Sequence, residues 1–111
     1  MKASGIILAI FLCVIFTTVL SADQRGEAIF KSNGCVFCHK LEGVSSGTIP
    51  SLSDLAEAYK GKKERLIQYL KGEVDPIIKP KRAIIMKRQL EKTKALSDSE
   101  RTALADFMLS H

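Results

Sequence analysis

Five consecutive residues have the types and the spacing to do chemistry: Cys35, Val36, Phe37, Cys38 and His39. Two cysteines separated by two residues and followed at once by a histidine form the attachment pattern of c-type haem. Each thiol can add to one vinyl group of the porphyrin, and the adjacent His39 is then carried to the iron as an axial ligand. The pattern predicts one covalent haem c bound by Cys35 and Cys38.

Other chemistry for the same residues is less well supported by the sequence. A redox-active dithiol of the thioredoxin type belongs beside a βαβ pattern, and no strand pattern of any length is present. A tetrahedral zinc site needs four ligands, and beyond the first 22 residues the candidates are Cys35, Cys38, His39 and His111, without a second closely spaced pair. A disulfide between Cys35 and Cys38 closes too small a loop to stabilise much.

A second axial ligand is expected from a methionine, because a thioether favours Fe(II) and raises the reduction potential. Met86 follows an irregular, proline-containing segment, Glu73–Pro80, which can wrap the far side of a porphyrin, and we predict that Met86 is this ligand. Its alternative role is that of a core methionine in a helix. Met108 lies beside Phe107 on an apolar helical stripe, where packing is the simpler role. His111 is a weaker candidate because it is the terminal residue.

The first part of the chain has the layout of a secretory signal. Lys2 precedes an apolar run, Ile6–Leu20, which ends in the small residues Ser21 and Ala22. We therefore expect residues 1–22 to be a signal peptide that is cleaved on export to the periplasm. The alternative is an uncleaved anchor that leaves the protein on the membrane facing the periplasm, because the 18 residues from Gly5 to Ala22 are just at the lower limit for spanning a bilayer.

The remaining residues, 23–111, are predicted to form one all-α domain of several short helices wrapped around the haem. The most secure helix follows Ser97, because Ser97 and Glu100 form a capping box ahead of an apolar stripe. Ile84–Leu96 is less clear: it has helix formers and a charged character, and the alternative is a loop around Met86 with only a turn or two of helix. The other expected elements are a helix capped by Asp23 and ending near Asn33, a loop over Leu41–Ser51, and helices over Asp54–Lys60 (capped by Ser51 or Ser53) and Lys63–Lys71.

Charge restricts the partners. Seventeen Lys and Arg residues face 12 Asp and Glu residues, a formal charge of +5. No nucleic-acid motif accompanies this surplus, so we expect no nucleic-acid partner, and a membrane partner only if the leader is retained. Basic residues gather around Met86, either as solvated charge or as a positive rim that steers redox proteins with acidic docking surfaces. These residues are Lys79, Lys81, Arg82, Lys87, Arg88, Lys92 and Lys94.

With these motifs in place, residues 23–111 resemble the small bacterial class I cytochromes c, of the monohaem, short-loop type. The resemblance implies that the first and last helices cross closely, with Gly26 and Phe30 against Leu104 and Phe107. It is carried by Gly26 and Phe30, Cys35-x-x-Cys38-His39, Pro50-Ser51-Leu52, Met86, and Leu104-x-x-Phe107-Met108.

The resemblance also implies that the Pro50 carbonyl accepts a hydrogen bond from the His39 ring and so orients the ligand. Two features depart from the family pattern. Lys87 follows Met86 where many relatives have proline, and the chain has no Trp to bind the haem propionates. The first departure concerns the shape of the segment around Met86 more than the ligand itself.

These residues together predict a periplasmic one-electron carrier with a six-coordinate, His39/Met86-ligated haem, and not an enzyme. An iron with both axial positions filled offers no site to a substrate. Two other functions stay open on the sequence: a haem c subunit of a larger oxidoreductase complex, for example in sulfur-compound oxidation, and an enzyme or gas sensor in which Met86 does not bind.

Overall fold

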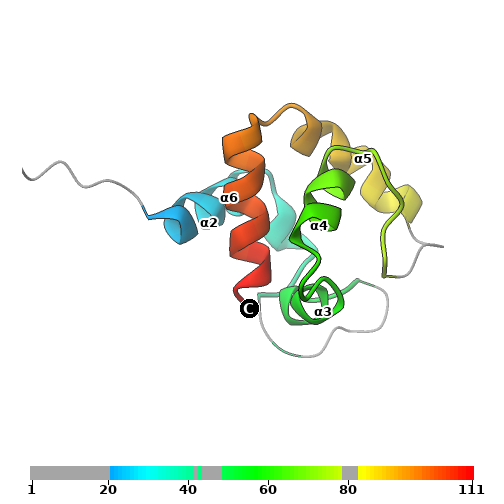
Figure 1. Cartoon of the computed structure of the whole chain (residues 1–111), viewed down its shortest axis with the longest axis horizontal. Coiled ribbons are helices and arrows are strands. Elements are labelled where there is room, and N and C mark those ends of the chain that lie inside the picture. Colours follow the sequence, from blue (N-terminus) through cyan, green and yellow to red (C-terminus); the bar gives the residue numbers. More distant parts are fainter. Residues whose placement is uncertain (1–20, 42, 44–48, 79–82) are drawn as a thin grey trace, which may run out of the picture.

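The computed structural model describes residues 21–41, 43, 49–78 and 83–111. The predicted leader up to Leu20, and Lys79, Lys81 and Arg82 of the basic cluster, lie outside these residues. Within the described ranges the secondary structure is entirely helical, which confirms the predicted all-α class. The elements in chain order are α2 (Ala22–Ser32), the 3₁₀ turn η1 (Cys35–Phe37), α3 (Leu52–Ala58), α4 (Lys63–Leu70), α5 (Ala83–Lys94) and α6 (Asp98–Leu109) (Figure 1).

The terminal helices α2 and α6 cross in close contact, as predicted. Gly26 is buried in the crossing, and a Cβ atom there would collide with the Ala103 carbonyl oxygen and lie 2.5 Å from the Phe107 Cβ. Beside it, the rings of Phe30 and Phe107 pack with centroids 5.5 Å apart. Because glycine has no side chain, the two backbones approach closely enough for these rings to fill the crossing.

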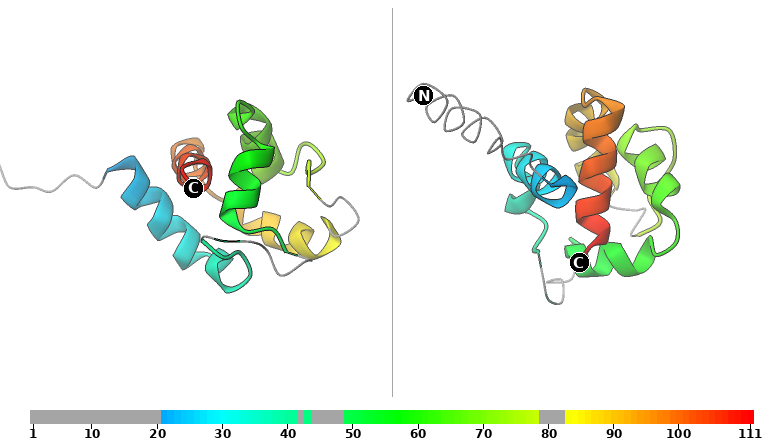
Figure 2. Two further views of the ribbon diagram at one scale, coloured as in Figure 1. Left: turned by 90° about the horizontal axis from the view of Figure 1, so that it is seen from below. Right: turned by 60° about the vertical axis from the view of Figure 1, so that its left-hand side comes forward.

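Helix α6 lies between α2 on one side and α4 on the other, with α3 near its C-terminal end (Figures 1 and 2). The buried side chains of α3 and α4 complete the core on the side away from α2. They are Leu52, Leu55, Leu66, Tyr69 and Leu70, together with Tyr59, the C-cap residue of α3. Along the described parts of the chain, no helix has the length and apolar character needed to cross a membrane.

Three of the helices begin with the same reciprocal cap. Ser51 with Asp54 and Ser97 with Glu100 each form a capping box, in which the serine side chain and the residue three further on satisfy each other's backbone N–H groups. The first helix does the same with Ser21 and Gln24, so the predicted cap at Asp23 is wrong. Asp23 has no glutamate or glutamine three residues later, whereas Ser21 has Gln24.

The other helix boundaries differ from prediction by short distances. The helix expected over Asp54–Lys60 begins two residues earlier because Ser51 is its cap. α4 ends at Leu70, one residue before the predicted end, and beyond the C-cap Lys71 lies Gly72 with φ +76°, a backbone conformation that suits glycine.

The segment around Met86, for which the sequence left a helix and a loop open, is helical. It is not a loop, because α5 runs without a break from Ala83 to Lys94 and includes Met86. Among its described side chains only Leu90 and Thr93 are buried. Ile84 and Ile85, which could have packed with Met86 in a core, are 77% and 62% exposed.

Candidate functional site

A cavity of about 620 Å³ opens between η1, α3, α4, α5 and α6. This volume lies within the range of roughly 300–1,000 Å³ that is usual for sites that bind cofactors and other small molecules. The walls are largely apolar and come from the core, and include Leu55, Tyr59, Leu66, Leu70 and Ile78. The cavity therefore suits a flat, apolar group that enters the core from one side.

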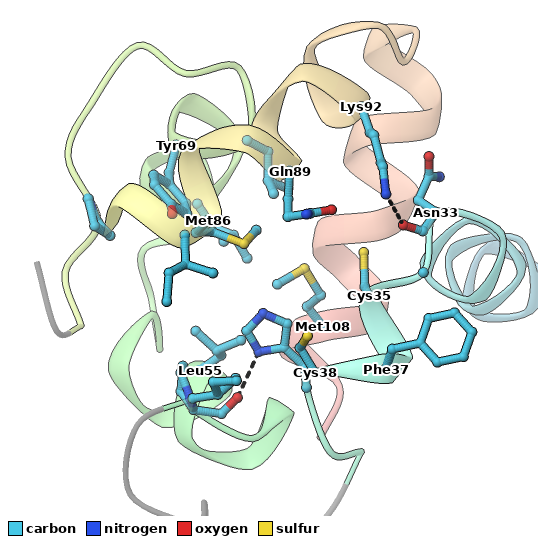
Figure 3. A pocket seen from close by; sticks show the side chains of 18 of the residues that line it. Asn33, Cys35, Phe37, Cys38, Leu55, Tyr69, Met86, Gln89, Lys92 and Met108 are labelled. Atoms are coloured by element: carbon cyan, nitrogen blue, oxygen red, sulfur yellow. Dashed lines mark hydrogen bonds between the residues drawn. The ribbon is translucent and has the colours of Figure 1, made fainter. Parts of the chain in front are cut away.

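Both motif cysteines line this cavity and neither forms a disulfide (Figure 3). Gly34, with φ +75°, ends the connection from α2, and η1 then folds back so that the Cys38 and His39 N–H groups donate to the Cys35 carbonyl at 3.2 and 2.9 Å. This tight turn carries both thiols and the imidazole to the same cavity. Burial raises the pKa of the Cys35 thiol, with the Lys92 ammonium opposing the shift.

The His39 ring is fixed by the loop that precedes α3. Its Nδ1 lies 2.8 Å from the Pro50 carbonyl oxygen, which is drawn as a dashed line in Figure 3. A carbonyl can only accept, so Nδ1 carries the proton and Nε2 keeps its lone pair for a metal. The neighbouring Leu52 N–H donates to the Lys40 carbonyl at 2.8 Å and holds the two segments together.

Two methionines, Met86 from α5 and Met108 from α6, turn their sulfur atoms into the cavity (Figure 3). Met108 is 6% exposed and belongs to the core on the α6 stripe with Leu104 and Phe107. Met86 is half-buried and packs against the edge of that core. The structure thus brings both candidate thioethers to the cavity that holds Cys35, Cys38 and His39.

Two tyrosines that the sequence analysis did not single out also line the cavity. Burial raises the pKa of Tyr69 to about 12, with Tyr59 nearby adding to the shift, and burial likewise raises the pKa of Tyr59. The Tyr59 hydroxyl accepts a hydrogen bond of 3.2 Å from the Ile77 N–H. Both phenols stay neutral at ordinary pH, so these walls bring no charge to the cavity. In the sequence, the signal for their burial was their helical spacing from apolar residues, since Tyr59 follows Leu55 by four residues and Tyr69 follows Leu66 by three.

The basic residues that lie within the described part of the cluster are all exposed on α5: Lys87, Arg88, Lys92 and Lys94. Lys92 reaches the rim of the cavity, where its Nζ donates to the Asn33 carbonyl at 3.2 Å (Figure 3). This contact links α5 to the segment that leads into η1.

The residues present fit a covalent haem. The cavity offers two free thiols on one turn, an imidazole with a free Nε2, neutral apolar walls and two thioethers, which are the donors that haem iron takes from proteins. An all-helical fold that surrounds a cavity with these donors defines a class of protein, the helical proteins with covalently attached haem.

Comparison with protein families agrees with this class. Residues 24–111 match the family Cytochrome c, and the chain therefore belongs to the cytochrome c family. No curated protein matches the chain. Membership implies covalently bound haem c, and Cys35 and Cys38 lie in a stretch with the CXXCH pattern of such an attachment. It also means that the protein is a haem-based electron carrier of a family that typically transfers electrons and does not catalyse.

Proposed function

We propose that this protein is a periplasmic one-electron carrier whose haem iron is coordinated by His39 and Met86, and that it is not an enzyme. The observation that carries the proposal is the shared cavity: His39 is held by Pro50 with Nε2 free, and the Met86 thioether enters the same cavity from α5. Two filled axial positions leave no place for a substrate on the iron, which is the reason to expect electron transfer alone.

When bound, the haem supplies the Fe(III)/Fe(II) couple, and the chain's own groups hold and tune it. The Pro50 carbonyl fixes the tautomer of His39 and makes its Nε2 a better donor. The thioether and the neutral tyrosine walls favour the less charged, reduced state. Since each ligand is fixed to a helix or to a hydrogen-bonded turn, the site needs little rearrangement when an electron arrives or leaves.

Met86 is the better candidate of the two methionines because Met108 already has a packing role. Met108 lies within the buried stripe of α6, where it packs in the core with Leu104 and Phe107. Met86 has few such contacts to lose, since most of its neighbours on α5 are exposed.

The ferric absorbance spectrum tests this choice, because methionine ligation gives a weak charge-transfer band in the red. We expect the band in the native holoprotein, its loss in Met86→Ala, and its retention in the matched control Met108→Leu. A band that survives Met86→Ala would show that the ligand assignment is wrong. A native protein without the band, whose reduced form binds carbon monoxide readily, would show that it is not a closed electron carrier.

Export and a cleaved leader are the second part of the proposal and are tested on protein from its native host. The charge and apolar pattern of residues 1–22 supports them. Mass spectrometry of the periplasmic fraction should give the chain without its leader and with one haem added. Recovery only from membranes with residues 1–22 present supports the anchored form, and recovery only within a larger complex supports the subunit function.

For partners, we propose redox proteins with acidic docking surfaces. The exposed cations of α5 support this, because they flank Met86 and extend to the cavity rim at Lys92. Stopped-flow electron transfer to an acidic redox protein should slow as salt is added. Replacing Lys87 and Arg88 together by Gln should weaken that salt dependence, whereas Lys60→Gln, an exposed control outside α5, should not. Equal effects of both changes would contradict docking through α5.

A further inference from the structure

Helix α5 is anchored mainly through its C-terminal half. Of its described side chains, only Leu90 and Thr93 are buried, and both lie downstream of Met86. The N-terminal half presents Ile84 and Ile85 at high exposure. Whatever fixes the last turns of α5 therefore also fixes the position of Met86.

The last turn of α5 is bound by Arg101, a buried side chain of α6 that is 4% exposed. Its Nε donates to the Thr93 carbonyl at 3.0 Å, and one terminal nitrogen donates to the Lys94 and Leu96 carbonyls at 3.0 and 2.6 Å. The other terminal nitrogen pairs with Asp98 at 2.9 Å. A guanidinium thus donates to the carbonyls at the end of a helix, of which that of Thr93 also accepts from the Leu96 N–H at 3.3 Å, and its charge suits the negative end of the helix dipole.

Thr93 makes a second attachment, to a different helix. Its hydroxyl lies 2.6 Å from the Leu70 carbonyl at the end of α4 and 3.1 Å from the Leu90 carbonyl within α5. Thr93 is 2% exposed, so water cannot easily replace the bond to Leu70. Arg101 and Thr93 together connect the end of α5 to α4 and to α6.

Met86, Leu90 and Thr93 are spaced four and then three residues apart and so share one face of α5. A continuous helix transmits the position of one turn to the next. We propose that Arg101 and Thr93 are positioning residues that hold α5 against the cavity and thereby limit how readily the Met86 thioether leaves the iron. This inference rests on the proposed ligation by Met86 and adds the residues that control it.

Imidazole binding to the ferric holoprotein tests the proposal, since imidazole can bind only when the thioether has moved away. Thr93→Val keeps the shape of the side chain but leaves the buried Leu70 carbonyl without its donor. We expect imidazole affinity to rise about tenfold, which is the scale of one lost buried hydrogen bond. Thr93→Ser, which keeps the hydroxyl, should stay near the native affinity. Arg101→Met removes every donor of the guanidinium and should raise imidazole affinity more than Thr93→Val does.

Two controls separate local opening from general instability. Thr102→Val makes the same chemical change on α6, at a half-exposed residue that has no hydrogen bond to α5 among the described residues. Leu104→Ala destabilises the core at a residue that is 1% exposed and takes no part in the hydrogen bonds of Arg101 and Thr93. Both should leave imidazole affinity within about twofold of native, which is less than 0.5 kcal/mol at 1.4 kcal/mol per tenfold.

Native affinity in both Thr93→Val and Arg101→Met would overturn the proposal, and so would an equal rise in Leu104→Ala. Failure of the Met86 assignment gives a different result: Met86→Ala would then bind imidazole no more tightly than native protein, and the substitution would leave the red charge-transfer region of the spectrum unchanged. The two failures are therefore distinguishable in one set of titrations.

Discussion

Replacing Gly26 by alanine is the sharpest test of how the two terminal helices hold the fold. On a solvated helix this change stabilises by about 1 kcal/mol, because alanine loses less backbone entropy on folding. In this protein the added Cβ collides with the Ala103 carbonyl oxygen and lies 2.5 Å from the Phe107 Cβ. Neither atom is the end of a flexible side chain, so the crossing of α2 and α6 has to widen.

The magnitude follows from the balance of these two effects. Forcing one extra carbon into a well-packed region costs roughly 1–3 kcal/mol, and the upper end applies where backbone must move. Subtracting the gain in helix propensity leaves a net loss of about 2 kcal/mol. A wider crossing also separates the rings of Phe30 and Phe107, which now pack with centroids 5.5 Å apart.

The assay is urea unfolding of the holoprotein, followed by far-ultraviolet circular dichroism. Ala28→Gly is the matched control, because Ala28 is exposed on the same helix and the change runs in the opposite direction. We expect Ala28→Gly to cost about 1 kcal/mol from propensity alone, less than Gly26→Ala. A Gly26→Ala protein that is as stable as native, or more stable, would refute the close crossing.

Two further predictions concern single hydrogen bonds. Glu100 accepts from the Ser97 N–H at 3.0 Å, which lowers the pKa of its carboxyl below 4.5. Because the pKa of Glu100 is lower in the folded state than in the unfolded state, the charged carboxylate stabilises the fold at a pH above the unfolded-state pKa. This stabilisation is lost as the pH falls through the folded-state pKa. Glu100→Gln should therefore be less stable than native at neutral pH and equal to it in strong acid. Urea unfolding across that range checks this, and a gap that does not narrow contradicts it. Tyr59→Phe removes the acceptor for the Ile77 N–H and should cost about 1 kcal/mol in the same assay, whereas no measurable cost would mean that water replaces the bond.

The parts of the fold that could be predicted from the sequence are those with a local cause. Cys35, Cys38 and His39 lie on one tight turn, so their spacing alone brings them to one site. The capping box at Ser97 and the apolar stripe that follows it predict where α6 begins and which of its faces is buried. The close approach at Gly26 was accessible only through the family resemblance, since a glycine within a helix has no single meaning.

The segment around Met86 could not be predicted because the causes of its structure are distant in the sequence. The proline-containing segment upstream left a loop open as an alternative, yet α5 is helical. The carbonyls at its end accept hydrogen bonds from Arg101, a residue of the next helix. Arg101 itself looks like an ordinary surface cation in the sequence. Its burial and its three carbonyl partners appear only when α5 and α6 are placed together.

The site is therefore assembled from two parts that should respond differently to mutation. The attachment turn and His39 follow directly from α2, which is packed tightly on α6 at Gly26. Met86 depends on α5, which has only two buried side chains among those described and is held at its end by Arg101 and Thr93. Gly26→Ala should thus lower the free energy of unfolding while leaving imidazole affinity near native, and Thr93→Val should raise imidazole affinity by more than its effect on unfolding accounts for. If the two variants instead changed both quantities in the same proportion, the protein would open only as a whole, and α5 would have no separate role in controlling the ligand.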